Sequence, residues 1–147
     1  MPFLLILLVV VTGLGQPIQI AANNRLREAV QSSGLSALIG FLVGGILLTT
    51  LILSGLIERG ELSGLARAPW WAWVGGAFAV FSAVVGIVAL PHLSAASLIA
   101  AAILGQLVAS TVIDHFGWLN VPVVPINKSR IVGAVLLFVG ALLMRRT

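Results

Sequence analysis

Five apolar stretches alternate with short polar joints along this 147-residue chain; four of them are about 20 residues long and the fifth is the shortest. A hydrocarbon core about 30 Å thick is crossed by roughly 20 apolar residues in helical form. Backbone exposed to lipid must satisfy its own hydrogen bonds, so each stretch is predicted to be a transmembrane helix. The predicted spans are Pro2–Ala22, Leu35–Ile57, Pro69–Leu90, Leu93–Asp114 and Arg130–Met144. The chain is therefore expected to be an all-α integral membrane protein with a single five-helix domain over residues 1–147.

The composition removes several classes of function. Hydrophobic residues make up 60% of the chain and charged residues 8%, and there is no Cys for disulfide, thiolate-metal or thiol chemistry. We find no metal cluster, phosphate-binding glycine loop or nucleophile–base pair, so no enzyme activity, metal or cofactor is expected. The net charge of +4 comes from basic residues at helix ends, where they anchor to headgroups, and does not indicate nucleic-acid binding. All four carboxylates lie in joints or at a helix end, namely Glu28, Glu58, Glu61 and Asp114.

The basic residues give no preferred orientation, because five spans place four Lys or Arg residues on each side of the membrane. One side holds Arg59, Arg67, Lys128 and Arg130, and the other holds Arg25, Arg27, Arg145 and Arg146. Orientation normally follows an excess of Lys and Arg on the cytoplasmic side. The tie leaves two alternatives: dual topology, in which opposite copies pair, and a weakly biased single orientation. The first span lacks Lys and Arg at its amino end, and four spans follow it, so a retained helix is favoured over a cleaved signal peptide.

The first span carries a polar face. Thr12, Gln16, Gln19 and Asn23 are spaced by four, three and four residues, which places them on one side of a helix. Pro17 removes a backbone N–H within this face and predicts a kink or an opened turn. Broken membrane helices expose carbonyls that bind solutes or ions. The alternative is that the amides form hydrogen bonds between helices, which contribute about 0.6 kcal/mol each.

The fourth span repeats this pattern with Gln106, Ser110 and Asp114, each four residues after the last. Gln106 lies near mid-membrane by residue count, and Asp114 lies about 12 Å further along the helix. Asp114 is either a gate for solute or ions, or a structural ion-pair partner of Lys128 or Arg130 on the same side. Rows of small residues along the spans predict close helix packing. The longest are Ser36, Gly40 and Gly44 in the second span and Ala101, Gly105 and Ala109 in the fourth.

The whole chain resembles the YdcZ-like small membrane proteins of the bacterial drug/metabolite transporter superfamily. The matching residues are Gln19, Asn23 and Leu26 after the first span, Phe41-Leu42-Val43-Gly44 in the second, Pro69-Trp70-Trp71 opening the third, Gly105-Gln106, Ser110 and Ile113-Asp114-His115-Phe116-Gly117 ending the fourth, and Gly140 with Arg145-Arg146 closing the fifth. The resemblance implies an inner-membrane, multi-pass protein similar to half of a ten-helix transporter. The related small multidrug resistance exporters use a Glu in their first helix for proton exchange. Gln16 and Gln19 stand in that region here, so that mechanism is not carried over.

Together these features predict a transporter of a small solute that works in the bilayer as an antiparallel homodimer with inverted repeats. The expected solute-binding residues are Gln16, Gln19, Asn23, Gln106 and Ser110, with Asp114 as a gate or ion-pair residue. An uncharged centre suits neutral polar, zwitterionic or anionic solutes. The alternative function is a structural or accessory membrane subunit whose polar faces serve helix packing.

Overall fold

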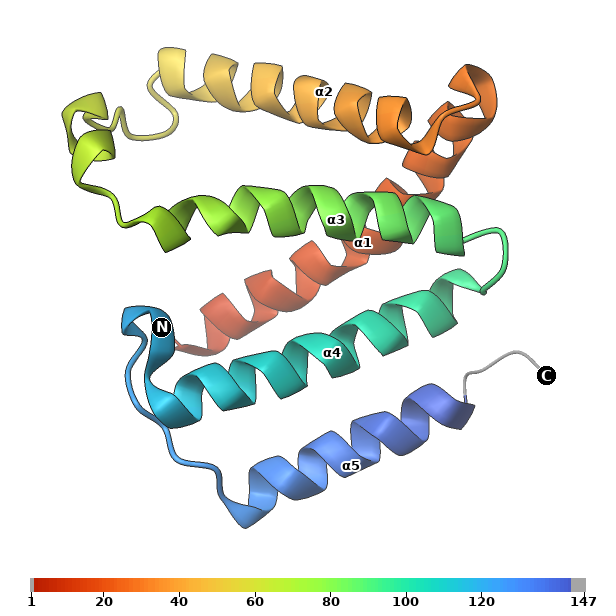
Figure 1. Ribbon diagram of the computed structural model, residues 1–147, viewed down its shortest axis with the longest axis vertical. Coiled ribbons are helices and arrows are strands. Elements are labelled where there is room, and N and C mark those ends of the chain that lie inside the picture. Colours follow the sequence, from red (N-terminus) through yellow and green to blue (C-terminus); the bar gives the residue numbers. More distant parts are fainter. Residues whose placement is uncertain (1, 144–147) are drawn as a thin grey trace. The chain divides into compact units, whose positions relative to one another are not determined.

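The regular secondary structure of the computed structural model, which describes residues 2–143, is entirely helical (Figure 1). This confirms the all-α prediction for the described part of the chain. The α-helices are α1 (Pro2–Val30), α2 (Ser33–Leu53), α3 (Val74–Ala89), α4 (Ala95–Phe116) and α5 (Lys128–Leu143). Short 3-10 helices occupy η1 (Leu62–Arg67), η2 (Trp70–Trp73) and η3 (Trp118–Asn120).

Within residues 2–143, four segments are long and apolar enough to cross a membrane: Phe3–Val30, Ser33–Leu53, Trp70–Ala89 and Ala95–Phe116. Helix α5 has 16 described residues, which span about 24 Å at 1.5 Å per residue, short of a hydrocarbon core. The fifth span is therefore not confirmed and stays a prediction. Its predicted end at Met144, and the Arg145-Arg146 pair, lie outside the described residues.

Local capping explains where the helices begin and end. The backbone N–H of Leu35 donates to the Ser32 hydroxyl (3.2 Å) at the start of α2, and that of Ser97 donates to the Ser94 hydroxyl (3.1 Å) at the start of α4. Helix α2 ends at Leu53, four residues before the predicted boundary. Helix α1 continues through Pro17 to Val30, so the opened turn expected at this proline is wrong and the predicted kink stays a prediction.

The chain forms two compact units, one made of residues 22–88 and the other of residues 1–21 with 89–147, of which 2–21 and 89–143 are described. The boundary at residues 21 and 22 lies within α1, which contributes to both units. The prediction of one domain over residues 1–147 is not tested by this division and stays a prediction.

In the unit of residues 22–88, the carboxyl end of α1 packs against the start of α2. The Ser36 hydroxyl donates a 2.5 Å hydrogen bond to the Asn23 carbonyl, and Ser36 and Ala37 are buried. A Cβ atom added at Gly40 would lie 2.9 Å from Asn23 Oδ1, closer than ordinary packing allows. Gly40 therefore permits the close approach of these two helices that the row of small residues predicts.

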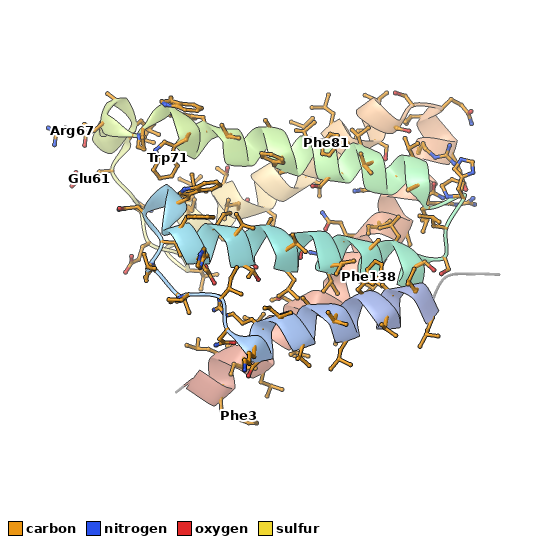
Figure 2. The ribbon with its side chains drawn as sticks, turned by 60° about the horizontal axis from the view of Figure 1, so that its bottom comes forward. Phe3, Glu61, Arg67, Trp71, Phe81 and Phe138 are labelled. Carbon is orange, nitrogen blue, oxygen red and sulfur yellow. The ribbon has the colours of Figure 1, made fainter. Side chains whose placement is uncertain are left out.

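In the other unit, α4 and α5 run side by side in opposite directions, joined by residues 117–127 (Figures 1 and 2). Gly117 ends α4 in the left-handed conformation (φ 64°), where a Cβ atom would lie 2.6 Å from Val123 Cγ2. The chain then returns toward the end of α4 as an extended segment, in which the backbone N–H of Val124 donates to the Asp114 carbonyl (2.8 Å). This return places the start of α5 beside Asp114.

Candidate solute-binding site

The carboxyl end of α4 and the amino end of α5 are joined by an ion pair. Arg130 Nη1 lies 3.1 Å from Asp114 Oδ2, and the two side chains are 32% and 27% exposed. Of the two structural partners that the sequence offered for Asp114, Lys128 and Arg130, the structure pairs it with Arg130. Whether the pair also acts as a gate stays a prediction.

The loop between the two helices holds Arg130 in place. Arg130 Nη1 also donates to the Val124 carbonyl (3.4 Å), and the Arg130 backbone N–H donates to Asn127 Oδ1 (2.9 Å) in the first turn of α5. The Ile126 backbone N–H donates to His115 Nδ1 (3.2 Å), next to Asp114 on α4. The loop is thus tied to both helix ends and orients the guanidinium toward the carboxylate.

Each member of this pair stands at the unfavourable end of its own helix. The carboxyl end of a helix carries partial negative charge and the amino end partial positive charge. Yet the negative Asp114 lies near the carboxyl end of α4, and the positive Arg130 lies near the amino end of α5. A charge in such a position is less stable by about 0.3–1 kcal/mol than the opposite charge would be. The reverse order, with Arg on α4 and Asp on α5, would keep the ion pair and stabilise both helix ends. Helix stability therefore does not explain why Asp is on α4 and Arg is on α5.

The ion pair lies in the wall of a cavity of about 540 Å³ between α4 and α5. Its lining residues are Leu107, Ser110, Thr111, Asp114, Arg130, Gly133, Leu136 and Leu137. A second cavity of about 570 Å³ shares Leu136 and Leu137 with the first, and its lining is almost wholly apolar. The remaining residues of its lining are Pro17, Ala95, Ala96, Ile99, Ala100, Ile103, Gly140 and Ala141. Because the two cavities share Leu136 and Leu137, they adjoin along α4 and α5, and we call them together the groove, with the charged pair in the first cavity and apolar residues in the second.

Ser110 and Asp114 are the two predicted site residues that line this groove. The Ser110 hydroxyl donates to the Leu107 carbonyl (3.0 Å) of its own helix, which leaves its oxygen able to accept a hydrogen bond from a solute. Arg130 and Thr111 also line the cavity, and neither was among the predicted binding residues. Thr111 could have been found, because it lies three residues before Asp114 on the same helical face.

The three predicted glutamines lie on exposed helix faces. Gln16 and Gln19 are on α1, and Gln106 is half-way along α4, in helices long enough to span the membrane. None of the three side chains has a hydrogen bond to another residue among those the structure describes. Their role in solute binding is untested, but within residues 2–143 they do not bridge one helix to another.

Asn23 lies apart from the groove, in the unit of residues 22–88. Its carbonyl accepts the Ser36 hydroxyl and its side chain faces Gly40, so its contacts here are between α1 and α2. Its predicted role as a solute ligand is untested, and its described contacts are those of a helix-packing residue.

Comparison with known proteins supports the resemblance seen in the sequence. The family model described as "Putative inner membrane exporter, YdcZ" matches residues 4–143. The "Inner membrane protein YdcZ" of Escherichia coli (strain K12) is 28% identical over 139 residues, covering 93% of this chain and 91% of that protein. No solved structure matches the chain.

Proposed function

This chain belongs to the YdcZ family of inner membrane proteins, and from that membership we propose that it transports a small polar solute as an antiparallel homodimer. It is a multi-pass protein of the inner membrane, and its described residues 2–143 include four helices long and apolar enough to span it. The family description supports a role in membrane transport, in the direction of export.

One observation carries the proposal. Three glutamine side chains in membrane spans have no hydrogen-bond partner among the residues that the structure describes. An amide facing lipid without a hydrogen bond is unfavourable by at least 1–3 kcal/mol, as roughly estimated from protein mutations. Gln16, Gln19 and Gln106 therefore require water, a solute or another chain beside them. A wet pathway along these amides, which lie outside the linings of the two cavities of the groove, meets that requirement and matches the family's transport role.

A second copy of the chain supplies what one copy lacks. Many transporters rock two repeats of inverted topology about a site at the membrane midplane. One copy corresponds to half of such a device if α5 also spans, and the tie of four basic residues per side permits both orientations. The accessory-subunit alternative requires the same three amides to meet another protein instead of a solute.

Transport is tested with the full chain in proteoliposomes loaded with a mixture of neutral, zwitterionic and anionic metabolites. We expect mass spectrometry to find selected zwitterionic or neutral solutes lost faster than from liposomes without protein. Liposomes holding the Gln106→Leu variant serve as the control and are expected to retain the mixture. Equal retention by all three preparations would favour the accessory-subunit function.

Dual topology predicts that both membrane faces display the carboxyl terminus. We expect a C-terminal fluorescent protein, which fluoresces on the cytoplasmic side, and a C-terminal alkaline phosphatase, which is active on the other side, both to report signal. Adding two Lys residues to the joint at 58–68 should shift the signal to one reporter, because the basic residues are otherwise balanced. Activity of a single reporter in the unmodified chain would exclude dual topology.

Two glycines on α2 separate folding from self-association. A side chain at Gly40 meets Asn23, whereas a Cβ atom at Gly44 meets nothing within 4 Å in the described structure. We expect Gly40→Leu to lower the free energy of unfolding by about 1–3 kcal/mol through overpacking. Gly44→Leu should leave the melting temperature of the single chain unchanged and reduce the dimer fraction measured by mass photometry in nanodiscs. A wild-type chain that is monomeric at every lipid dilution would contradict the dimer.

A further inference from the structure

The Asp114–Arg130 pair keeps unused hydrogen-bonding capacity on both of its members. Both side-chain bonds of Arg130 leave from Nη1, and the bond to Asp114 is made at Oδ2. Among the residues that the structure describes, Arg130 Nε and Nη2 and Asp114 Oδ1 have no partner. A guanidinium offers five N–H donors and a carboxylate can accept at both oxygens. The pair can therefore receive one anionic and one cationic group side by side without being broken.

The balance of charge at this site favours a ligand that carries both signs. A lone cation or anion would compete with one member of the pair and leave the charge of the other member uncompensated in the groove, which is unfavourable for this partly buried pair. A zwitterion adds one positive and one negative charge, so the site stays neutral. Because the facing atoms of the pair are 3.1 Å apart, the two charges of the ligand must also lie close together.

The groove continues from this charged end into apolar surface. Leu137 lies seven positions after Arg130 on α5, a distance of about 10 Å. Leu136 and Leu137 line both cavities, and beyond them the lining is made of alanine, glycine and isoleucine with Pro17. The two cavities measure about 570 and 540 Å³. Cavities of roughly 300–1,000 Å³ suit drug-sized ligands.

We infer that the solute of this groove is a small zwitterionic amphiphile. Its adjacent ammonium and anionic groups lie against Asp114 and Arg130, and its apolar body lies along Leu136, Leu137 and Ile103. This inference rests on the proposed transport function and specifies the substrate class of the same site. It commits to a soluble, single-tailed molecule of this chemistry, and a two-tailed bilayer lipid is the competing occupant that the test separates.

The test measures binding to the full-length dimer in nanodiscs of phosphatidylglycerol, a lipid that carries no zwitterionic headgroup. The probe is α-aminooctanoic acid. Octanoic acid lacks its ammonium group, octylamine lacks its carboxylate, and α-aminobutyric acid lacks most of its tail. We expect the probe to bind at least about 10-fold more tightly than each of the three, after subtraction of partition into empty nanodiscs.

Two substitutions separate recognition of the headgroup from recognition of the tail. Arg130→Gln should remove the preference of the probe over octylamine. Leu137→Ala should weaken binding of the probe several-fold and leave α-aminobutyric acid unchanged, since Leu137 lines both cavities. Leu142→Ala, an exposed leucine on the same helix outside both linings, is the matched control and should bind the probe as the wild type does.

The outcomes distinguish this inference from the proposed function. The inference would be overturned if octanoic acid or octylamine bound as tightly as the probe. It would also be overturned if phosphatidylethanolamine added to the nanodiscs displaced the probe, because the groove would then be a lipid site. Proteoliposomes that release some other solute while the nanodiscs fail to bind the probe would leave transport standing and overturn the substrate class. Selective binding of the probe without release from any proteoliposome would support the zwitterion site and overturn transport.

Discussion

Replacing Gln106 by leucine is expected to weaken solute binding strongly and to leave the melting temperature of the solute-free protein unchanged or raised. Gln106 is half-way along α4, is exposed, and has no hydrogen-bond partner among residues 2–143. Removing an unpaired amide from a membrane span removes a desolvation penalty and breaks no bond within the chain. The hydrogen bond proposed between Gln106 and the solute is lost, and a loss of about 1–3 kcal/mol corresponds to roughly 5–150-fold weaker affinity.

The measurement combines thermal melting in lipid nanodiscs without solute and the proteoliposome release assay. Gln106→Asn is the conservative control: it keeps an amide at the same position and is expected to retain part of the transport. The accessory-subunit alternative predicts the opposite change in stability. In that case Gln106 is hydrogen-bonded to another chain, and Gln106→Leu lowers the melting temperature. A marked fall in melting temperature of Gln106→Leu, with loss of oligomer, would therefore replace the transporter proposal by the structural one.

Changing Asp114 to asparagine is expected to reduce transport by more than about 10-fold and to lower stability by at most about 1 kcal/mol. The stability effect is small because the Asp114–Arg130 pair is roughly one-third exposed, and exposed pairs contribute about 0–1 kcal/mol. The transport effect is large because the carboxylate lines the cavity and presents one of its two charges to the solute. Parallel melting and release assays on the same preparation separate the two effects.

The double change Asp114→Arg with Arg130→Asp tests whether the pair has only a structural role. It restores an ion pair and places each charge at the favourable end of its helix, so the melting temperature should equal or exceed that of the wild type. Transport of the native solute should remain low, because the two charges facing it have exchanged places. Full recovery of transport in the double variant would show that the pair serves stability alone and that Asp114 is no gate.

Much of the fold follows from hydropathy and local chemistry. The second, third and fourth spans were predicted to within about four residues of the observed ends, since apolar length and the capping residues Ser32 and Ser94 are local properties. The first helix continues eight residues past its predicted end at Ala22, to Val30. The opened turn predicted at Pro17 was wrong, since α1 continues as one helix from Pro2 to Val30. The fifth span lies at the limit of the hydropathy signal and stays a prediction.

The candidate site divides in the same way. Periodicity alone was enough to place Gln106, Ser110 and Asp114 on one helical face, because residues four apart on a helix are neighbours whatever packs against them. It left the partner of Asp114 open between Lys128 and Arg130. That choice depends on how the chain returns after Gly117, where a left-handed residue and the Val124 bond to Asp114 set the start of α5. The groove likewise combines residues from α1, α4 and α5, and contacts between helices distant in sequence are set by packing that no single segment encodes.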